Sequence, residues 1–356
     1  MLRQAPGSGR VVHLRDKVIS AGFALFGATR VHRLAAPLTR GLGAILMFHH
    51  VRPWVARDFA PNRLLEITPH FLDATLGLVK ARGFDIISLD AALQRIAAPG
   101  ERPFVVLTFD DGYWDNVEHA LPVLEKHAAP FTMFVTSGFA DRTARLWWIE
   151  LEEAIRRLQR VAVDGLQLPT STVAEKERAY AVLYRMLRAG PEERLLDVCA
   201  QLCLQAGIEP AKIPADLCLD WSGINAVAQH PLATIGVHTL THPMLAKHSE
   251  DVVRNELAES RARIEAAIGK PARHLAYPVG DPTSAGAREF AVARELGFAS
   301  AVTTRPGMIF PEHAAHATAL PRLSVNGRYQ SLDIIDILLS GAPFTLWNRG
   351  RRVNAA

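Results

Sequence analysis

From residue 43 onward, apolar and polar residues follow two alternating patterns. Short apolar runs are separated by longer amphipathic stretches, as in parallel strands joined by helices. The apolar runs predict strands at 44–51, 84–88, 104–109, 131–136, 233–237, 274–277, 299–303 and 320–323. This alternation predicts an α/β fold, a distorted (β/α) barrel of about seven strands.

The amphipathic stretches predict helices at 69–82, 117–127, 251–268 and 285–296. The first has the clearest boundaries, because Thr68 suits the N-cap, Pro69 the first helical position and Gly83 the stop. Residues 141–219 break the alternation: they are rich in Leu, Arg, Glu and Ala at helical spacing, with 160–163 as the candidate strand. We therefore expect a barrel over 41–340, a helical insertion over 141–219 and a C-terminal tail over 341–356.

Residues 1–40 form a basic segment in front of the barrel. They hold seven Arg and Lys residues against one acidic residue, Asp16, whereas the whole chain has a net charge of only +4. Apolar residues recur there at helical spacing and predict an amphipathic helix: Leu14, Val18, Ile19, Phe23, Leu25 and Phe26. Such a helix either lies on an anionic membrane surface or packs on its own domain, and periodicity does not distinguish the two.

No apolar run is long enough to span a membrane, and the run 18–28 lacks a good signal-peptide cleavage site. We therefore expect a cytoplasmic protein rather than a secreted one, with peripheral contact at the inner membrane as an open alternative. Nothing downstream repeats the basic clustering with interleaved aromatic residues, which argues against a nucleic-acid partner. The sequence does not indicate the oligomeric state.

The composition indicates a globular chain with a sizeable core, because 49% of the residues are hydrophobic and 21% are charged. The chain has three cysteines and no CxxC pair, so neither a disulfide framework nor a Cys-based zinc site is expected. Trp147 and Trp148 begin the insertion, and we expect them to pack helices rather than to stack on a sugar.

Polar residues follow two of the predicted strands, at the end where active sites of parallel α/β folds lie. Asp110 and Asp111 follow strand 104–109, where one carboxylate can bind a cation while the other stays free as a base. His238 and His242 follow strand 233–237, and their i, i+4 spacing places both imidazoles on one face if the segment is helical. Two histidines and one carboxylate make an open metal site with room for water and substrate.

A third group, Tyr277-Pro278-Val279-Gly280, follows strand 274–277. Glycine and proline there allow the backbone to approach a ligand closely and to present an N–H group, such as that of Val279. By itself this is a weak signal.

Together the motifs TFDDG at 108–112, HTLTH at 238–242 and YPVG at 277–280 resemble those of the NodB-like polysaccharide deacetylases, carbohydrate esterase family 4. The resemblance covers roughly 44–326 and implies a distorted barrel with one divalent metal, most often Zn²⁺, with Co²⁺, Ni²⁺ or Mn²⁺ as alternatives. It implies Asp110 as general base, Asp111, His238 and His242 as metal ligands, and Val279 with Tyr277 as the oxyanion and substrate contacts.

The chain departs from the commonest family pattern at two positions. Ala276 stands where an arginine is usual, and segment 320–323 lacks the usual histidine of the general acid. The sequence Phe48-His49-His50-Val51 is similar to a motif of the poly-β-1,6-N-acetylglucosamine deacetylase branch, which implies His49 as the acid and leaves His50 open. Arg322 is a candidate for the missing arginine beside Asp110.

We therefore expect a metal-dependent enzyme that hydrolyses the N-acetyl group of an amino sugar in a polysaccharide, an oligosaccharide or a lipid-linked glycan. Two alternatives remain. One is a related metal-dependent hydrolase of another C–N bond, in a formyl sugar or a cyclic amide. The other is a catalytically inactive carbohydrate-binding protein.

Overall fold

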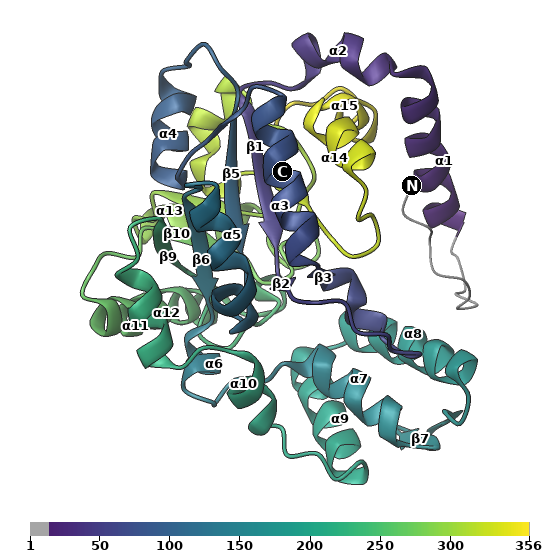
Figure 1. Cartoon of the computed structure of the whole chain (residues 1–356). Coiled ribbons are helices and arrows are strands. Elements are labelled where there is room, and N and C mark those ends of the chain that lie inside the picture. Colours follow the sequence, from purple (N-terminus) through teal and green to yellow (C-terminus); the bar gives the residue numbers. More distant parts are fainter. Residues whose placement is uncertain (1–13, 356) are drawn as a thin grey trace.

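The computed structural model describes residues 14–355, and its centre is a sheet whose strand pairs are all parallel (Figure 1). The order of neighbours is β11-β10-β9-β6-β5-β1-β12, with β4 paired to β5. The strands are β1 (Gly43–Phe48), β4 (Asp85–Ile86), β5 (Phe104–Phe109), β6 (Phe131–Val135), β9 (Ala233–Val237), β10 (His274–Ala276), β11 (Ser300–Val302) and β12 (Leu323–Ser324). The predicted α/β fold is confirmed.

The segment that leads into β12 links the two edges of this sheet. The Leu320 N–H donates to Ala301 O on the β11 side, and the Thr303 N–H donates back to Leu320 O. Three residues later, Leu323 of β12 pairs with Leu46 of β1. The sheet therefore curls into a distorted barrel, and segment 320–324 closes it.

Alternation along each strand separates the inside of the barrel from its helical cover. Ile45, Val106 and Phe134 belong to the inner cluster, together with residues of α4 (Leu89–Ala97). Their neighbours Leu46 and Leu107 face the larger outer core, which includes residues of the covering helices. The same period of two decides which side chains at the strand ends point inward.

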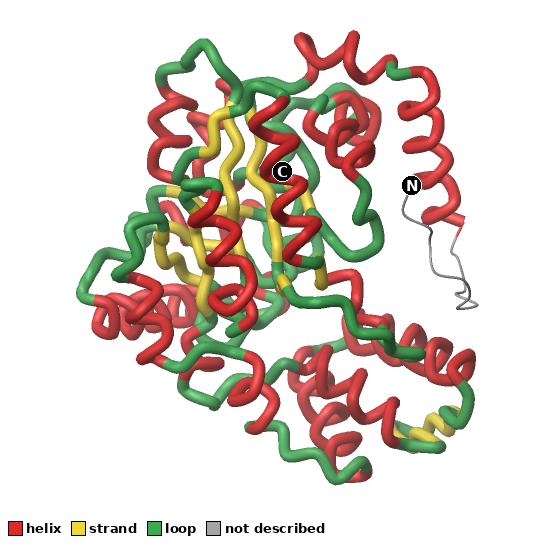
Figure 2. The backbone as a smooth tube through the Cα atoms, viewed as in Figure 1, coloured by secondary structure: helices red, strands yellow, loops and turns green. Residues whose placement is uncertain are grey.

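Helices cover the outside of the curled sheet (Figure 2). The covering helices are α3 (Pro69–Ala81), α5 (Leu121–Lys126), α6 (Ser137–Ala140), α11 (Trp221–Ala228), α12 (Glu250–Ile268), α13 (Ala287–Glu295) and α14 (Leu332–Leu339). Helix α3 begins as predicted, because Thr68 accepts a hydrogen bond from the Phe71 N–H and Pro69 is the first helical residue. A short π-helix, Asn116–Ala120, precedes α5, so predicted helix 117–127 is built from two pieces.

The predicted insertion forms a separate helical layer with its own hydrophobic core, below the sheet in Figure 1. Its elements are α7 (Trp147–Arg157), β7 (Arg160–Val163), β8 (Leu166–Pro169), α8 (Val173–Ala189), α9 (Glu192–Gln205) and α10 (Lys212–Leu217). Strands β7 and β8 form an antiparallel hairpin, of which the sequence predicted only the first strand. The three cysteines are buried and free, as expected.

The N-terminal helices α1 (Leu14–Thr29) and α2 (Val31–Thr39) contact the C-terminal helices α14 and α15 (Ala342–Trp347). Helix α15 lies in the segment that the sequence assigned to a tail. Phe23 packs edge-on against Tyr329, so part of the apolar face of α1 is used within its own domain. The side chains of Leu14 and Val18, and the basic residues Arg3 and Arg10, lie outside the described residues. No helix within 14–355 is long and apolar enough to cross a membrane.

Candidate metal centre and catalytic site

Five of the predicted site residues lie where the strands of the barrel end: His49, Asp110, Asp111, His238 and His242. Thr108 and Asp110 continue the inward-facing alternation of β5, whereas Phe109 packs in the outer core. In β9, Val237 packs in the outer core, so His238 turns inward. The carboxyl ends of parallel strands meet at one edge, which brings residues from distant parts of the sequence together.

Asp111, His238 and His242 offer one ligand atom each, and these atoms all lie within 4.8 Å of one another. Oδ1 of Asp111 lies 3.5 Å from Nε2 of His238 and 3.5 Å from Nε2 of His242. All three residues are buried. The structure therefore brings together the three side chains that the resemblance implied as ligands.

Backbone turns, rather than a helix, bring the two histidines together. Residues 238–242 form a loop in which Thr239 has φ 66° and His242 has φ 64°. Asp111 also has a positive φ, 72°. Non-glycine residues are rare in this region and are costly there, so the surrounding fold must hold them in place. The conditional prediction of a shared helical face is corrected in this respect.

Hydrogen bonds from Glu256 and within the loop hold residues 238–242 in this conformation. The Glu256 carboxylate of α12 accepts hydrogen bonds from the N–H groups of Leu240 and Thr241, both at 2.9 Å. The His242 N–H donates to Oγ1 of Thr239 at 3.0 Å. The conformation of the loop is therefore stabilised both by its own residues and by helix α12.

The donor set fits a divalent cation. Nδ1 of His238 lies 2.7 Å from the Ala276 carbonyl oxygen, which selects the tautomer protonated at Nδ1 and leaves Nε2 as a ligand atom. Oδ1 of Asp111 is buried and makes no hydrogen bond with a described residue. Two imidazoles and one carboxylate match the protein ligands of catalytic sites for zinc and similar metals.

The ionisation states of His242 and Asp111 suit a metal site. Burial lowers the pKa of His242 to about 3, so its imidazole is neutral near pH 7 and able to bind a metal. Burial alone would raise the pKa of Asp111, but the polar contact with His238 and the charges of the nearby histidines hold it well below its usual value. Asp111 is therefore a carboxylate, which is the form a cation requires.

Asp110 faces a different partner from its neighbour. Its two carboxylate oxygens accept hydrogen bonds from Nη1 and Nη2 of Arg322, both at 2.7 Å. Arg322 is fully buried, donates from Nε to the Thr303 carbonyl at 2.9 Å and also contacts Oγ1 of Thr108. Burial raises the pKa of Asp110, but the charge and hydrogen bonds of Arg322, together with the nearby His238 and His49, lower it below its usual value, so the carboxyl stays ionised.

His49 lies on the inner side of the strand end. Ile45 belongs to the inner cluster, and a period of two continues from it through Met47 to His49. Nε2 of His49 lies 4.0 Å from Oδ2 of Asp110, and its side chain is 19% exposed. Desolvation lowers the pKa of His49, against the opposing charges of Asp110 and Asp111. His49 therefore adjoins the carboxylate predicted to be the base.

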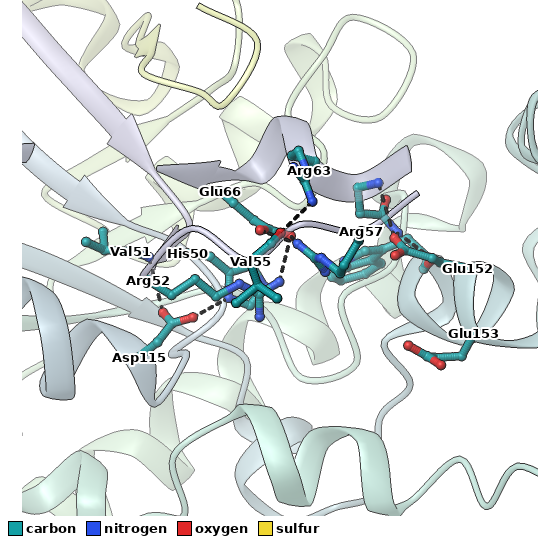
Figure 3. Close-up of polar contacts among 12 residues, drawn as sticks. His50, Val51, Arg52, Val55, Arg57, Arg63, Glu66, Asp115, Glu152 and Glu153 are labelled. Atoms are coloured by element: carbon teal, nitrogen blue, oxygen red, sulfur yellow. Dashed lines mark hydrogen bonds and ion pairs between the residues drawn. The ribbon is translucent and has the colours of Figure 1, made fainter. Parts of the chain in front are cut away.

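His50 points elsewhere, which corrects the alternative assignment of this residue to the site. Its Nδ1 lies 2.6 Å from Oδ2 of Asp115, and the Val51 N–H donates to the other oxygen of Asp115 (Figure 3). The imidazole stacks on Tyr113 with ring centroids 3.6 Å apart. Because neighbouring residues of a strand face opposite sides, only one of the two histidines reaches Asp110.

The segment that follows His50 is held by ion pairs. Glu66 of β3 (Glu66–Ile67) binds both Arg52 and Arg57, and Arg63 donates to the Val55 carbonyl (Figure 3). Strand β2 (His50–Val51) pairs with β3, and the short helix η1 (Pro61–Leu65) lies between them in the chain. These contacts fix the backbone just after His49.

Val279 and Tyr277 differ in burial and in the hydrogen bonds that they make. Val279 has φ 60°, and its N–H makes no hydrogen bond with another described residue, so this donor remains available. Tyr277 is fully buried: its hydroxyl donates to the Thr318 carbonyl and its ring packs on Phe290 of α13. Alternation after Ala276 turns this ring outward into the helical cover, so the Tyr277 side chain points away from the candidate site, and a contact of Tyr277 with substrate stays a prediction.

The sequence analysis did not place at the site two residues that lie beside the ligand set. Tyr113 is fully buried next to Asp111. Burial raises the pKa of the Tyr113 phenol, and the negative charge of Asp111 raises it further. Trp148 of α7 packs on His242 with ring centroids 4.8 Å apart. Trp148 was expected to pack helices, and it is indeed buried, but its position ties the insertion to the candidate metal site. Tyr113 directly follows the TFDDG motif, and this position in the sequence could have indicated that it lies beside the site.

Other histidines have structural partners instead. His127 pairs with Asp73, His248 with Glu192, and His313 is buried against Phe310. Within residues 14–355, Asp111, His238 and His242 are the one cluster of three side chains suited to a metal.

The structure is a curled parallel α/β barrel with a buried Asp-His-His cluster at its strand ends, and sequence comparison identifies its family. Residues 97–301 match the family of polysaccharide deacetylases, which is more than half of the chain. The chain therefore belongs to the polysaccharide deacetylase family, the NodB-like carbohydrate esterases. A search of curated proteins found no match.

Solved structures of deacetylases share the fold. The deacetylase PplD of Streptococcus pyogenes, solved with acetate, is 18% identical with a TM-score of 0.54, over 83% of this chain and 97% of that chain. IcaB from Ammonifex degensii is 18% identical with a TM-score of 0.53, over 84% and 98% of the respective chains. The BpsB deacetylase domain from Bordetella bronchiseptica is 17% identical with a TM-score of 0.50, over 81% and 97%.

Proposed function

We propose that this chain is a metal-dependent deacetylase that hydrolyses the N-acetyl group of an N-acetylhexosamine within a glycan. The observation that carries the proposal is the buried Asp111, His238 and His242 cluster directly beside the ion-paired Asp110. A binding protein has no need for a metal-ligand set and an adjacent, separately held carboxylate. Family membership supports a hydrolase.

Asp111, His238 and His242 would hold the divalent ion, with Zn²⁺ as the first candidate because nitrogen and carboxylate ligands suit it. When bound, such an ion supplies Lewis-acid polarisation of the amide carbonyl and lowers the pKa of water. The protein's own contribution is to keep Asp111 ionised and the imidazoles oriented, through the Ala276 carbonyl and the pinned loop.

Asp110 accepts the proton of the attacking water. Arg322 holds this carboxylate by two hydrogen bonds, so that both its orientation and its ionised state are set before substrate arrives. The free Val279 N–H is available to the oxygen that gains negative charge as water adds to the amide carbon.

His49 protonates the leaving amine nitrogen. Its Nε2 lies on the same side of the strand end as Asp110, at 4.0 Å from the nearer carboxylate oxygen. An amine is a poor leaving group unless it is protonated, so a positioned acid is required as much as a base. The role stays with His49 rather than His50, whose imidazole is committed to Asp115.

The resemblance at residues 48–51 favours a poly-N-acetylglucosamine as the substrate class, and an oligosaccharide or a lipid-linked glycan offers the same amide. IcaB and BpsB are structural relatives at low identity and support the fold only. A formyl sugar or a cyclic amide would use the same ligands and the same base.

The deciding experiment measures metal content and acetate release together. The purified full chain is loaded with Zn²⁺ and assayed on N-acetylglucosamine oligomers, next to Asp110→Asn and His238→Ala. We expect one metal per chain and acetate release in the wild type, metal without turnover in Asp110→Asn, and loss of metal in His238→Ala. His316→Ala, an exposed histidine on η4 (Pro311–Ala319), is the matched control and should retain both properties.

The results separate the alternatives. Metal without acetate release points to another acyl group, and formyl sugars and cyclic amides are then assayed with the same preparation. Absence of metal in the reconstituted wild type would reject the proposed chemistry and favour a carbohydrate-binding protein. Full activity of Asp110→Asn would reject the assigned base.

A further inference from the structure

Helices α2 and α15 present apolar side chains that the rest of the described chain leaves exposed. On α2, Leu34 is 84% exposed and Leu38 is 80% exposed, with Val31 on the same side. On α15, Leu346 is 73% exposed. The two helices contact each other at the upper end of the molecule (Figure 1), so we call Val31, Leu34, Leu38 and Leu346 the α2/α15 surface.

The outward direction of these residues follows from helix geometry. Positions 31, 34 and 38 lie on one face of α2, spaced three and four residues apart. His32 on the other side is buried, close to Asp336 of α14, and the neighbouring Arg33 pairs with the same carboxylate. Helix α2 therefore docks on its own domain by its polar side and turns its apolar side outward, the reverse of an ordinary surface helix.

The charge around the surface is positive. Residues 30–40 hold three arginines, residues 341–356 hold three more, and neither segment has an acidic residue. Arg30, Arg349 and Arg351 are exposed and form no ion pair with a described residue. Arginines next to exposed leucines are the composition of a surface that inserts into the interface of an anionic bilayer.

A second copy of the chain fits this surface less well. A symmetric dimer would place the same patch of each subunit against the other, so arginines would face arginines without acidic partners. Anionic lipid headgroups supply the opposite charge, and the acyl region accepts the leucines.

We propose that the α2/α15 surface docks this protein on an anionic lipid bilayer as a peripheral protein. The inference is independent of the proposed chemistry. It also determines the orientation of the candidate active site. Helix α2 leads into the beginning of β1, whereas His49 follows the end of β1, so the site lies at the opposite end of the strand.

A six-residue strand separates these two ends by about 20 Å. Docking through α2 and α15 consequently leaves the candidate active site facing away from the bilayer. This arrangement suits a glycan chain that extends from the surface better than a sugar whose amide lies among the headgroups.

Flotation with lipid vesicles tests the docking. The full chain is mixed with phosphatidylcholine vesicles with or without phosphatidylglycerol. We expect the wild type to float with the anionic vesicles only. The double variant Leu34→Gln with Leu38→Gln should bind these vesicles at least tenfold more weakly. Leu204→Gln on α9 is the matched control, since Leu204 is also 84% exposed but lies on the insertion.

A charge variant tests the second half of the proposal. Arg349→Gln with Arg351→Gln should weaken binding by about fivefold for each arginine removed, because each basic residue near an anionic surface contributes about 1 kcal/mol. Arg294→Gln, an exposed arginine on α13, should bind like the wild type. Circular dichroism and solution activity, which should match the wild type, show that the variants fold.

Three outcomes would overturn the proposal. The first is a wild type that does not float with anionic vesicles. The second is equal binding by the leucine variant and the Leu204→Gln control. The third is a leucine variant that changes from dimer to monomer in light scattering without any change in flotation, which would assign the surface to a second copy. Loss of acetate release in the wild type would leave the docking result unaffected, so the two proposals fail separately.

Discussion

Asp110 and Asp111 are adjacent in the chain but belong to two different interactions. Asp110 is bound by Arg322, and Asp111 faces His238 and His242. The positive φ of Asp111 turns the second carboxylate away from the direction of the first. This single backbone feature separates a carboxylate suited to metal binding from one suited to proton transfer.

The Arg322 pair predicts a shift in the pH profile. Burial raises the pKa of Asp110, but Arg322, together with His238 and His49, lowers it below its usual value, so replacing Arg322 by Met removes the largest lowering contribution. The base must be ionised to work, and a higher pKa therefore moves the acidic limb of kcat/KM to higher pH. Arg322→Lys keeps the charge and should restore part of the profile, but not the two-pronged hydrogen bonding.

A pH profile of kcat/KM for the three proteins checks this expectation. An acidic limb at the wild-type position in Arg322→Met would show that the arginine does not set the ionisation of Asp110. Metal content serves as the control, because Arg322 contacts none of the three candidate ligands among its described hydrogen bonds.

His49 predicts a dependence on the leaving group. His49→Ala should lower kcat on an N-acetyl amide by roughly 10²- to 10⁴-fold, the usual contribution of a general acid. The loss should be much smaller on p-nitrophenyl acetate, whose leaving group needs no protonation. His50→Ala is the comparison, since the two histidines are neighbours on opposite sides of the strand. Equal losses of His49→Ala on the amide and the ester would contradict the role as acid.

Short helices at the two ends of the chain are joined to the barrel by one carboxylate. Asp336 of α14 binds Arg33 of α2 at 3.0 Å and Arg82 at the end of α3. The side chain of Asp336 is only 9% exposed, whereas both arginines are partly exposed. In addition to its contact with α15, α2 is thereby attached to α3 and α14, which keeps its apolar side turned outward.

Asp336→Asn should lower the free energy of unfolding by about 1–2 kcal/mol near neutral pH, less than for a fully buried pair. Burial raises the pKa of Asp336, but Arg82 and then Arg33 lower it further, below its usual value. The contribution of the carboxylate is therefore complete above its unfolded-state pKa of about 3.9 and is lost as pH falls through the lower folded-state value.

Urea unfolding of wild type and Asp336→Asn, measured from neutral pH down to about pH 3, checks both parts of this prediction. The difference between the two proteins should be constant near neutral pH and shrink at the acidic end. A difference that grows as the pH falls would have the wrong sign for this carboxylate.

The ligand set joins three distant parts of the chain, so metal binding should stabilise the whole molecule. Zn²⁺ at about 100 times its Kd would add about 2.7 kcal/mol to the free energy of unfolding. For a chain of this length that corresponds to a rise in Tm of about 4 °C. The rise should be absent in His242→Ala and present in Asp110→Asn, as measured by differential scanning fluorimetry with and without EDTA. An equal rise in His242→Ala would place the bound metal elsewhere.

Many features of this protein are determined by residues that lie close together in the sequence. Short apolar runs and helical patterns predicted the strands and the barrel, and strands 104–109 and 233–237 match β5 and β9 to the residue. The Thr68 cap is also local, because an N-cap depends on residues within one turn. Motifs close to strand ends indicated the family and the residues that the structure brings together.

Tertiary structure decided what depends on distant residues. Arg322 reaches Asp110 only because segment 320–324 closes the barrel between β11 and β1, and no local pattern encodes that closure. The loop that joins His238 to His242 depends on Glu256 of α12, which lies outside the motif. The outward turn of Tyr277 and the placement of Trp148 on His242 likewise follow from packing between separate elements. Periodicity predicts that a helix has an apolar face, but only the packed fold determines whether another element covers that face. No element within residues 14–355 covers Leu34 and Leu38 of α2.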